Sequence, residues 1–213
     1  NKFTASWCPP CGSWGWEVGS LIKSDASTEG KVLYLGTYGS TSSSWNNNKL
    51  FSSEAQQFGS TYSLSAFPTF VSNAESIDVI SAINNGGGYQ AGADAVLEVV
   101  EEFLEEDVYV NTNITAELDG DDLMIDVQTQ FFEDKSGDYY LAVYIIEDEV
   151  EEVQANQTGV VKHSNVWRAA IDGEIFGNEL NDGEDVTDAQ LFETDYEFSI
   201  GSEWDDDNLK VAT

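Results

Sequence analysis

Residues 4–11 read Thr-Ala-Ser-Trp-Cys-Pro-Pro-Cys and include both cysteines of this 213-residue chain, Cys8 and Cys11. We expect a helix to begin at the first cysteine, where unpaired backbone N–H groups and the helix dipole favour a thiolate. The spacing puts the Cys11 sulfur one helical turn further on, within disulfide distance of Cys8. The motif therefore predicts a pair that cycles between dithiol and disulfide, in which Cys8 attacks and Cys11 resolves the mixed disulfide.

Two prolines stiffen the turn between the cysteines. Pro9 and Pro10 fix φ at about −65° and remove N–H donors that a helix start leaves unpaired anyway. Gly12, Gly15 and Gly19 then follow along one side of the expected helix. Each glycine costs up to about 1 kcal/mol relative to Ala, which indicates either close packing or a mobile helix.

A structural disulfide and half of a metal site are the alternatives to a redox pair. Zinc is normally held by four ligands, whereas this chain offers two Cys and one His. A c-type haem motif needs His at the place of Gly12. The sequence therefore predicts no metal and no other cofactor at the cysteines.

The composition is strongly acidic. The chain carries 40 Asp and Glu against eight Lys and Arg, for a net charge of −32. Nucleic-acid binding is excluded because phosphate contacts need several basic groups, and the same deficit argues against electrostatic docking on anionic lipid. The surface suits cations and basic partners instead.

The charge is unevenly divided along the chain. Residues 1–107 hold 13 acids and four Lys, a charge of −9, whereas residues 108–213 hold 27 acids and four basic residues, a charge of −23. Domains typically contain about 100–150 residues. We therefore predict two domains, 1–107 and 108–213.

The first half shows alternating strand and helix patterns. The apolar run 32–35 predicts a buried parallel strand, residues 50–58 a short helix, and residues 67–71 another strand. From 93 to 106, apolar residues recur at helical spacing with glutamates on the other face. This order indicates an α/β domain.

The second half changes to a period of two. Leu, Ile and Val alternate with Met, Asp and Gln over 123–128, and Asp119-Gly120 supplies a hairpin-type turn. The pattern predicts a small antiparallel sandwich. Its further strands are expected at residues 139–146, 160–171, 196–200 and 209–212.

Two motifs carry a resemblance to a known family. Segment 4–11 resembles the active-site segment of thioredoxin-like proteins exported by bacteria, and Phe67-Pro68-Thr69 resembles their cis-proline loop. The resemblance implies an α/β thioredoxin-like domain with a mixed sheet. It also implies that Pro68 is cis beside the cysteine pair and that the Phe67 backbone pairs with an incoming chain. Trp7, Phe67 and Pro68 are the substrate-binding residues it implies.

One stretch is longer than this resemblance requires. Cys11 and Pro68 are 57 residues apart, and the Ser- and Asn-rich stretch 39–48 is the expected insertion. Trp45 within it could cover the redox site.

A second resemblance spans the whole chain. A thioredoxin-like domain followed by a β-domain containing His163-Ser164-Asn165-Val166-Trp167-Arg168 is similar to the outer-membrane-protein-28-related family, typical of Bacteroidetes envelopes. It implies a second domain that is an all-β immunoglobulin-like sandwich. It also implies an extracytoplasmic location in the periplasm, outer membrane or cell surface.

The ends of the sequence read as strands cut short, so we expect an internal piece of a longer protein. The sequence has no run of 18 apolar residues, the length needed to span a membrane.

The single histidine and the acidic loops are candidates for other roles. His163 is either structural or a catalytic group that lies near Cys8 in the fold. Acidic segments 119–122, 182–188 and 205–207 offer oxygen ligands that suit calcium, yet none has the EF-hand spacing. Solvated loops are the alternative to a calcium site.

Two hypotheses about function follow. The first is thiol–disulfide exchange on envelope or secreted proteins, with protein thiols or disulfides as partners, which would make the chain an oxidoreductase. The second is a cell-surface binding or structural protein whose cysteines persist as a disulfide. Lys2 stands where thioredoxins often bury an Asp, and the lack of an obvious proton acceptor for Cys11 favours the second hypothesis.

Overall fold

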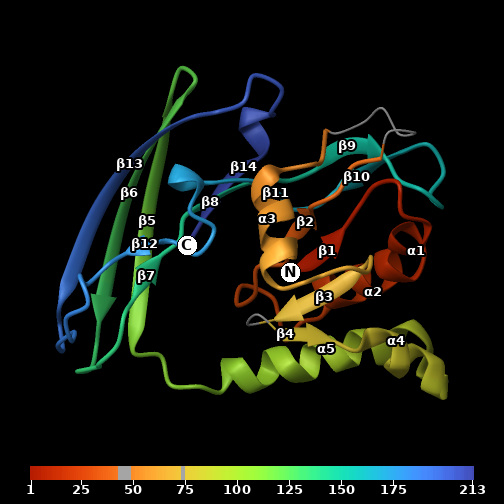
Figure 1. Cartoon of the computed structure of the whole chain (residues 1–213), viewed down its shortest axis with the longest axis horizontal. Coiled ribbons are helices and arrows are strands. Elements are labelled where there is room, and N and C mark those ends of the chain that lie inside the picture. The colour runs from red at the N-terminus through yellow and green to blue at the C-terminus, as the bar shows by residue number, and fades with distance from the viewer. Residues whose placement is uncertain (43–48, 73–74) are drawn as a thin grey trace. The chain divides into compact units, whose positions relative to one another are not determined.

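The computed structural model describes residues 1–42, 49–72 and 75–213, and Trp45 lies outside the described residues. It forms two compact units (Figure 1). The first contains Asn1–Glu106 and Asp148–Arg168, and the second contains Asp107–Glu147 and Ala169–Thr213. The fold is mixed α/β, with more residues in strands than in helices. The composition change near Asp107 falls where the chain leaves the first unit, but Asp148–Arg168, which the sequence put in the second domain, packs with the first.

The first unit contains a mixed sheet in the order β11-β2-β1-β3-β4. Strand β1 pairs in parallel with β2 and antiparallel with β3, while β11 meets β2 in parallel at Val166 and Gly36. The predicted strand 32–35 is wrong: β2 begins only at Gly36, and Leu33 is 44% exposed. These strands are β1 (Lys2–Thr4), β2 (Gly36–Tyr38), β3 (Thr69–Ser72), β4 (Glu75–Ile77) and β11 (Val166–Ala170), of which the last runs on into the second unit.

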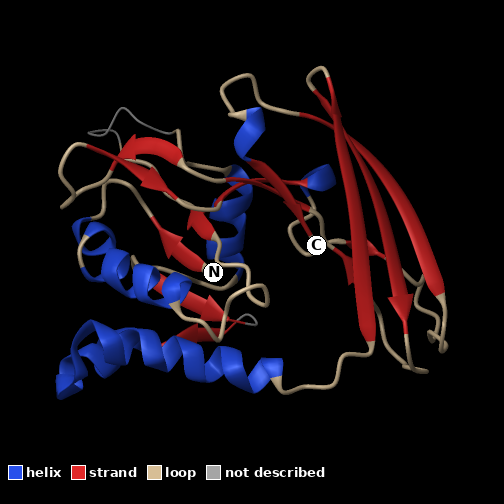
Figure 2. Cartoon of the chain, turned by 180° about the vertical axis from the view of Figure 1, so that it is seen from behind, coloured by secondary structure: helices blue, strands red, loops and turns tan. Residues whose placement is uncertain are grey.

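Helices cover both faces of this sheet. Helices α2 and α5 lie side by side (Figures 1 and 2) and bury Val18 and Leu97 with Phe70 of β3. Successive strand residues face opposite ways, so Phe3 points away from α2 and instead meets α3 at Gly59. The helix predicted at 93–106 is confirmed, although it begins earlier. The helices are α1 (Pro9–Gly12), α2 (Trp14–Ser24), α3 (Ser53–Thr61), α4 (Val79–Ala82) and α5 (Gly88–Leu104), with a π-helical turn η1 (Ile83–Gly87) between the last two.

A hairpin from late in the chain completes the first unit. Strands β9 (Val150–Val153) and β10 (Val160–His163) pair antiparallel. The predicted strand 160–171 is interrupted after β10, because Asn165 adopts the left-handed conformation with φ 47°. The chain turns there and enters β11.

The second unit contains a three-stranded antiparallel sheet in the order β13-β6-β5. Strands β5 (Val110–Asp119) and β6 (Asp122–Phe131) form the predicted hairpin, and Gly120 supplies the positive φ of 68° that its turn requires. Strand β13 (Leu191–Ser199) pairs along the other edge of β6. The predicted alternation is confirmed, since Leu, Ile and Val of β6 are buried while the intervening side chains are exposed.

A second layer of short strands closes the core of this unit. Side chains Leu123, Ile125 and Val127 of the three-stranded sheet share one apolar cluster with Val143 and Ile145. The predicted strand 139–146 is interrupted into two strands. The short strands are β7 (Tyr140–Leu141) paired with β12 (Asn178–Glu179), and β8 (Tyr144–Glu147) paired with β14 (Leu209–Ala212). Two 3₁₀ turns, Ile171–Gly173 and Asp206–Asn208, lie in the connections.

Candidate functional site

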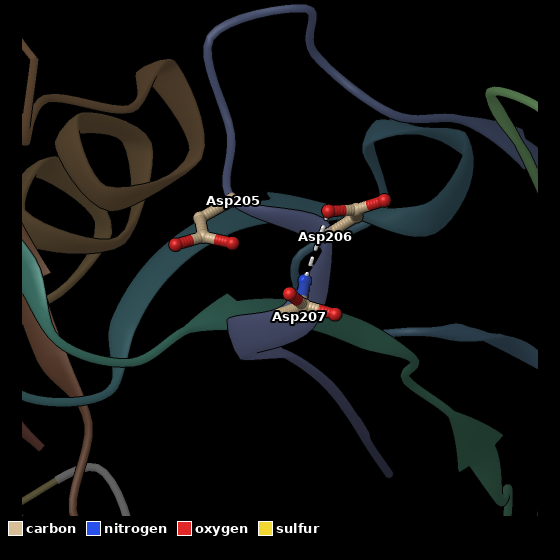
Figure 3. A group of neighbouring side chains, drawn as sticks. All are labelled: Asp205, Asp206 and Asp207. Atoms are coloured by element: carbon tan, nitrogen blue, oxygen red, sulfur yellow. Dashed lines mark hydrogen bonds between the residues drawn. The ribbon is translucent and has the colours of Figure 1, made fainter.

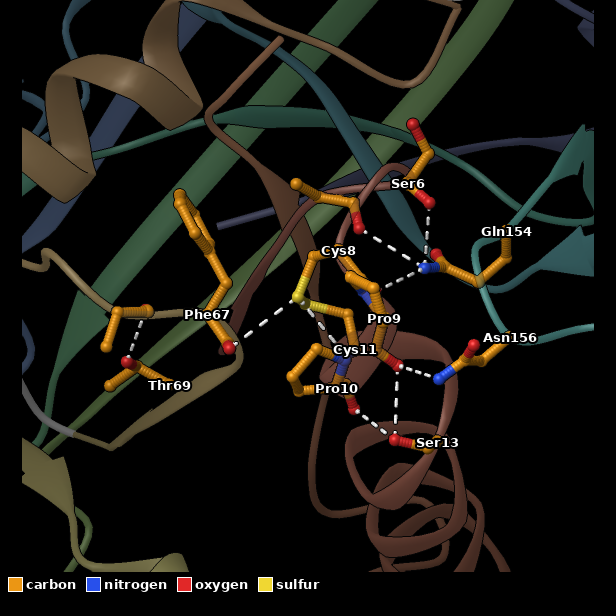
Figure 4. The surroundings of a disulfide bond; sticks show 12 residues. Ser6, Cys8, Pro9, Pro10, Cys11, Ser13, Phe67, Thr69, Gln154 and Asn156 are labelled. Carbon is orange, nitrogen blue, oxygen red and sulfur yellow. Dashed lines mark hydrogen bonds between the residues drawn. A yellow bond between two sulfur atoms is a disulfide. The ribbon is translucent and has the colours of Figure 1, made fainter. Parts of the chain in front are cut away.

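The two cysteines form a disulfide at the start of α1 (Figure 4). Cys8 is the residue that caps this short helix, and the backbone N–H of Cys11 donates to Cys8 Sγ at 3.2 Å. A donor aimed at sulfur favours the thiolate form after reduction. The geometry gives this donor to Cys8, the residue predicted to attack.

The cis-proline loop lies against Cys8. The peptide bond between Phe67 and Pro68 is cis, as predicted. The carbonyl oxygen of Phe67 lies 3.6 Å from Cys8 Sγ, and a dashed line marks this contact in Figure 4. On its other side Pro68 packs so closely on α2 that a Cβ at Gly15 would overlap its ring. For this glycine, close packing is the explanation.

Aromatic side chains flank the pair. The Trp7 ring meets Phe67 edge-on at 5.7 Å between centroids, and Phe67 lies 4.9 Å from Phe3. Trp7 Nε1 is buried and has no hydrogen-bond partner among the described residues. The structure therefore brings Trp7, Phe67 and Pro68 together with the cysteines. Their role in substrate binding stays a prediction.

Sequence reasoning missed a third element of the site, residues 154–157 between β9 and β10, which we name the β9–β10 turn. Gln154 Nε2 donates to the backbone carbonyls of Ala5, Ser6 and Cys8 at 3.3, 2.9 and 3.2 Å. The first two carbonyls lie just before the cysteine motif, and the third belongs to its first cysteine. Gln154 is itself only 3% exposed, so one buried amide holds the entry to the cysteine loop.

The rest of the β9–β10 turn follows the loop past the cysteines. Asn156 Nδ2 donates to the carbonyl of Pro9 at 3.2 Å (Figure 4), and Gln157 Nε2 donates to the carbonyl of Gly12 at 2.6 Å. A Cβ at Gly12 would overlap the carbonyl oxygen of Ala155. A glycine directly after the motif is therefore required by the close approach of a second backbone.

This arrangement limits access to sulfur. Cys8 is 3% exposed and Cys11 is fully buried, whereas Pro9 and Pro10 between them are exposed. A partner that attacks or is attacked at Cys8 needs a displacement of the surrounding loops. The β9–β10 turn is one of the two segments against the pair, with the cis-proline loop as the other.

His163 lies in the first unit and is buried. Its Nδ1 lies 2.6 Å from the Tyr38 hydroxyl and its Nε2 lies 3.3 Å from the carbonyl of Glu152. Burial, opposed by the Glu152 hydrogen bond, lowers the pKa of His163 to about 4. The imidazole is thus neutral, and Tyr38 donating to Nδ1 while Nε2–H donates to Glu152 satisfies both nitrogens. These contacts support the structural alternative.

The acidic segment 205–207 places three carboxylates near one another on the surface (Figure 3). Their ligand atoms lie within 4.8 Å of each other, and Asp206 Oδ1 accepts the N–H of Asp207 at 3.1 Å. In residues 1–42, 49–72 and 75–213, neither of the other two acidic segments forms such a group. All three side chains are exposed, which is the arrangement of a solvated loop.

We expect screening, and not a specific ion, to stabilise this acidic chain. Like charges repel over roughly 10 Å at 0.1 M salt, so NaCl, MgCl₂ and CaCl₂ at matched ionic strength should raise the Tm of the whole chain by similar amounts. Asp206→Asn should respond as the wild type does. A shift produced by CaCl₂ alone and lost in Asp206→Asn would contradict this expectation.

Comparisons with known proteins place the chain in a family. Its structure is similar to HBP35 of Porphyromonas gingivalis, with a TM-score of 0.70 at 14% sequence identity, over 99% of this chain and 66% of that one. The chain thus spans under two thirds of HBP35, and this likeness concerns the fold alone. No curated protein matches it in sequence.

Residues 55–213 match the family described as outer membrane protein Omp28, which indicates an envelope location. Within the described residues, every helix is too short or too polar to cross a bilayer. Because the match covers most of its length, the chain belongs to the Omp28 outer membrane protein family.

Proposed function

We propose that the chain carries out thiol–disulfide exchange on envelope or secreted proteins through Cys8 and Cys11. The observation that carries the proposal is the environment of Cys8 Sγ. It accepts the N–H of Cys11 at 3.2 Å and lies 3.6 Å from the Phe67 carbonyl, beside the cis Pro68. The first contact favours a thiolate on Cys8, and the second leaves a backbone carbonyl next to the reacting sulfur.

In the proposed reaction the Cys8 thiolate attacks one sulfur of a partner disulfide. The partner's S–S bond breaks as the mixed disulfide forms, and the released partner thiolate takes a proton from water. Cys11, one helical turn away and already bonded to Cys8 in this structure, then displaces the second partner sulfur. Two electrons pass from the cysteine pair to the partner, and the reverse sequence oxidises a partner dithiol.

The proposal includes a fold assignment for each unit. We infer that the first unit is thioredoxin-like, because its mixed sheet has helices on both faces and carries the cysteine motif beside a cis-proline loop. We infer that the second unit is an immunoglobulin-like sandwich from its two layers of strands around one apolar core. Family membership supports the architecture but not the chemistry, since the matched residues begin after the cysteines.

One observation favours a second candidate function. Both cysteines are nearly or fully buried, and the β9–β10 turn is hydrogen-bonded along the loop that holds them. A disulfide that stays closed under these contacts would be structural. The chain would then be a surface binding or structural protein, and its acidic second half would suit a basic partner.

Cysteine reactivity tests the proposal. After reduction, Cys8 in Cys11→Ser should react with iodoacetamide at pH 7 at least tenfold faster than Cys11 in Cys8→Ser, because Cys8 Sγ accepts an N–H that favours a thiolate and Cys11 is fully buried. Cys11→Ser should also retain a glutathione mixed disulfide that the wild type resolves. Each variant serves as the control for the other.

Two results would reject it. Equal or reversed alkylation rates would remove the assigned roles. A reduction potential below about −300 mV in glutathione buffers would identify a structural bond and favour the second candidate.

A further inference from the structure

A lysine ammonium is buried behind the second cysteine. Lys2 of β1 is 6% exposed, and its Nζ donates to the backbone carbonyl of Cys11 at 3.4 Å. The same Nζ lies 5.8 Å from the centroid of the Trp16 ring. Among the residues that the structure describes, no carboxylate is paired with Lys2. An ammonium removed from water without an anion is costly, so a negative charge that forms close to Nζ would be stabilised by it.

The groups around Lys2 are cationic or neutral. It lines a cavity of about 70 Å³ to which no Asp or Glu contributes. Burial, and then the charge of Lys23, lowers the pKa of Lys2 to about 7, and His163 remains neutral at that pH. Near neutral pH, a new negative charge close to Nζ would therefore change how much of Lys2 is protonated. The titratable groups lining the cavity are Lys2, Lys23, Tyr34, Tyr38, Lys162 and His163.

The cavity also connects Lys2 to the surface. Exposed Ser20 and Lys162 line the same space. Its volume is sufficient for water, which occupies about 30 Å³ per molecule in the liquid. A proton on Lys2 can therefore exchange with solvent without passing the sulfur atoms.

Given exchange at the cysteines, on which this inference rests, we infer that Lys2 is a positioning residue whose charge stabilises the Cys11 thiolate while the mixed disulfide is resolved. Of the two cysteines, both of which the structure describes, Cys11 is the one whose backbone carbonyl accepts from Lys2, and it is fully buried. A buried thiolate is disfavoured unless a cation or a donor lies near it. Lys2 is a buried cation, and its Nζ contacts Cys11 through the backbone carbonyl.

The resolving step conserves atoms and electrons. The Cys11 thiol gives its proton to water, and its sulfur attacks Cys8 Sγ. The bond between Cys8 and the partner's sulfur breaks, and the partner leaves as a thiolate that is protonated by water. The cysteine pair loses two electrons and the partner's former disulfide gains them, while Lys2 transfers none. When the new S–S bond removes the anion, Lys2 releases its proton more readily into the cavity.

The size of the effect follows from two opposing trends. A neighbouring opposite charge lowers a pKa by roughly one to three pH units, and each unit gives tenfold more thiolate. Nucleophilicity falls with pKa at a Brønsted slope of about 0.4–0.5, which removes about threefold per unit. The net acceleration from a charged Lys2 is therefore about threefold to thirtyfold.

The test follows the lifetime of the glutathione mixed disulfide. The reduced chain is mixed with glutathione disulfide between pH 5.5 and 9.5, quenched with acid and analysed by mass. At pH 6 Lys2→Met should resolve the intermediate about 3- to 30-fold more slowly than the wild type. The rate at which the wild type resolves the intermediate should rise less steeply above pH 7, where Lys2 loses its charge. The corresponding rate of Lys2→Arg should continue to rise. Lys31→Met, which removes an exposed charge, should match the wild type.

The possible results are distinguishable. If the wild type forms no mixed disulfide with glutathione, the proposed function fails. If the wild type resolves it and Lys2→Met keeps the same rate and pH profile, only the Lys2 inference is overturned. Should Lys2→Met not fold, the Lys2→Arg variant decides the question. If its resolution rate showed the same change of slope near pH 7 as the wild type, the inference would also be overturned.

Discussion

Gly12→Val is expected to displace the β9–β10 turn from the cysteine loop and to lower the free energy of unfolding by about 3–5 kcal/mol. A Cβ at Gly12 would overlap the Ala155 carbonyl oxygen and lie 2.9 Å from Gln154 Cγ. The obstacle is backbone, so a rotamer change cannot relieve it. Overpacking typically costs about 1–3 kcal/mol, and each hydrogen bond lost with the turn adds about 1 kcal/mol.

Two measurements check this prediction. Urea unfolding should show a lower midpoint, and the reduced cysteines should alkylate at least tenfold faster because the loop is no longer held. Gln56→Val, at an exposed position of α3, is the matched control and should lose only the small helix-propensity difference. Wild-type stability and alkylation in Gly12→Val would show that the turn does not lie on the loop in solution.

His163 should make the chain less stable in acid. Its pKa is about 4 in the folded state, against 6.5 for an unperturbed histidine, so between these pH values the unfolded state binds more protons. The contribution to stability is complete above about pH 6.5, falls as the pH drops through the window, and is lost below about pH 4. A difference of about 2.5 pH units corresponds to roughly 3 kcal/mol.

The measurement compares unfolding free energies of the wild type and His163→Leu across pH 4–7. Because the carboxylates titrate in both proteins, the difference between the two curves isolates the histidine, and it should change by roughly 3 kcal/mol. Tyr38→Phe is the control: it removes the hydroxyl that donates to Nδ1 but keeps the imidazole buried, so its curve should retain most of the wild-type slope, because burial is the main cause of the lowered pKa. A His163→Leu curve parallel to the wild type would mean that the imidazole is accessible in the folded chain.

Local patterns predicted much of the site and part of the fold. The cysteine motif and Phe67-Pro68 could be found because backbone restriction and sulfur spacing are properties of a few adjacent residues. The alternation over 123–128 likewise follows from one sheet with one buried face. The strand was wrongly predicted at 32–35 because these apolar residues directly precede the true strand, β2. The β2 sequence Gly36-Thr37-Tyr38 is not typical of a buried strand, although all three residues are buried.

The β9–β10 turn could not be predicted in the same way. Gln154, Asn156 and Gln157 bind backbone carbonyls between 145 and 149 residues away. Every residue has a carbonyl, so the acceptors leave no trace in the sequence, and the donors are amides of a kind found in any loop. Lys2 presents a similar difficulty, because composition counts its charge but does not indicate that the charge is buried.

The unit that holds the cysteines is not a contiguous length of chain, and this affects how it can be inherited. A recombination event that cut the gene at the codon for Asp107 would separate the cysteines from the hairpin that holds their loop. Exchange of the downstream portion for that of another protein would carry Gln154 and His163 away with it. A minimal fragment that holds the cysteines must therefore rejoin Asn1–Glu106 to Asp148–Arg168 through a linker, and natural shuffling of this family should preserve both pieces or neither.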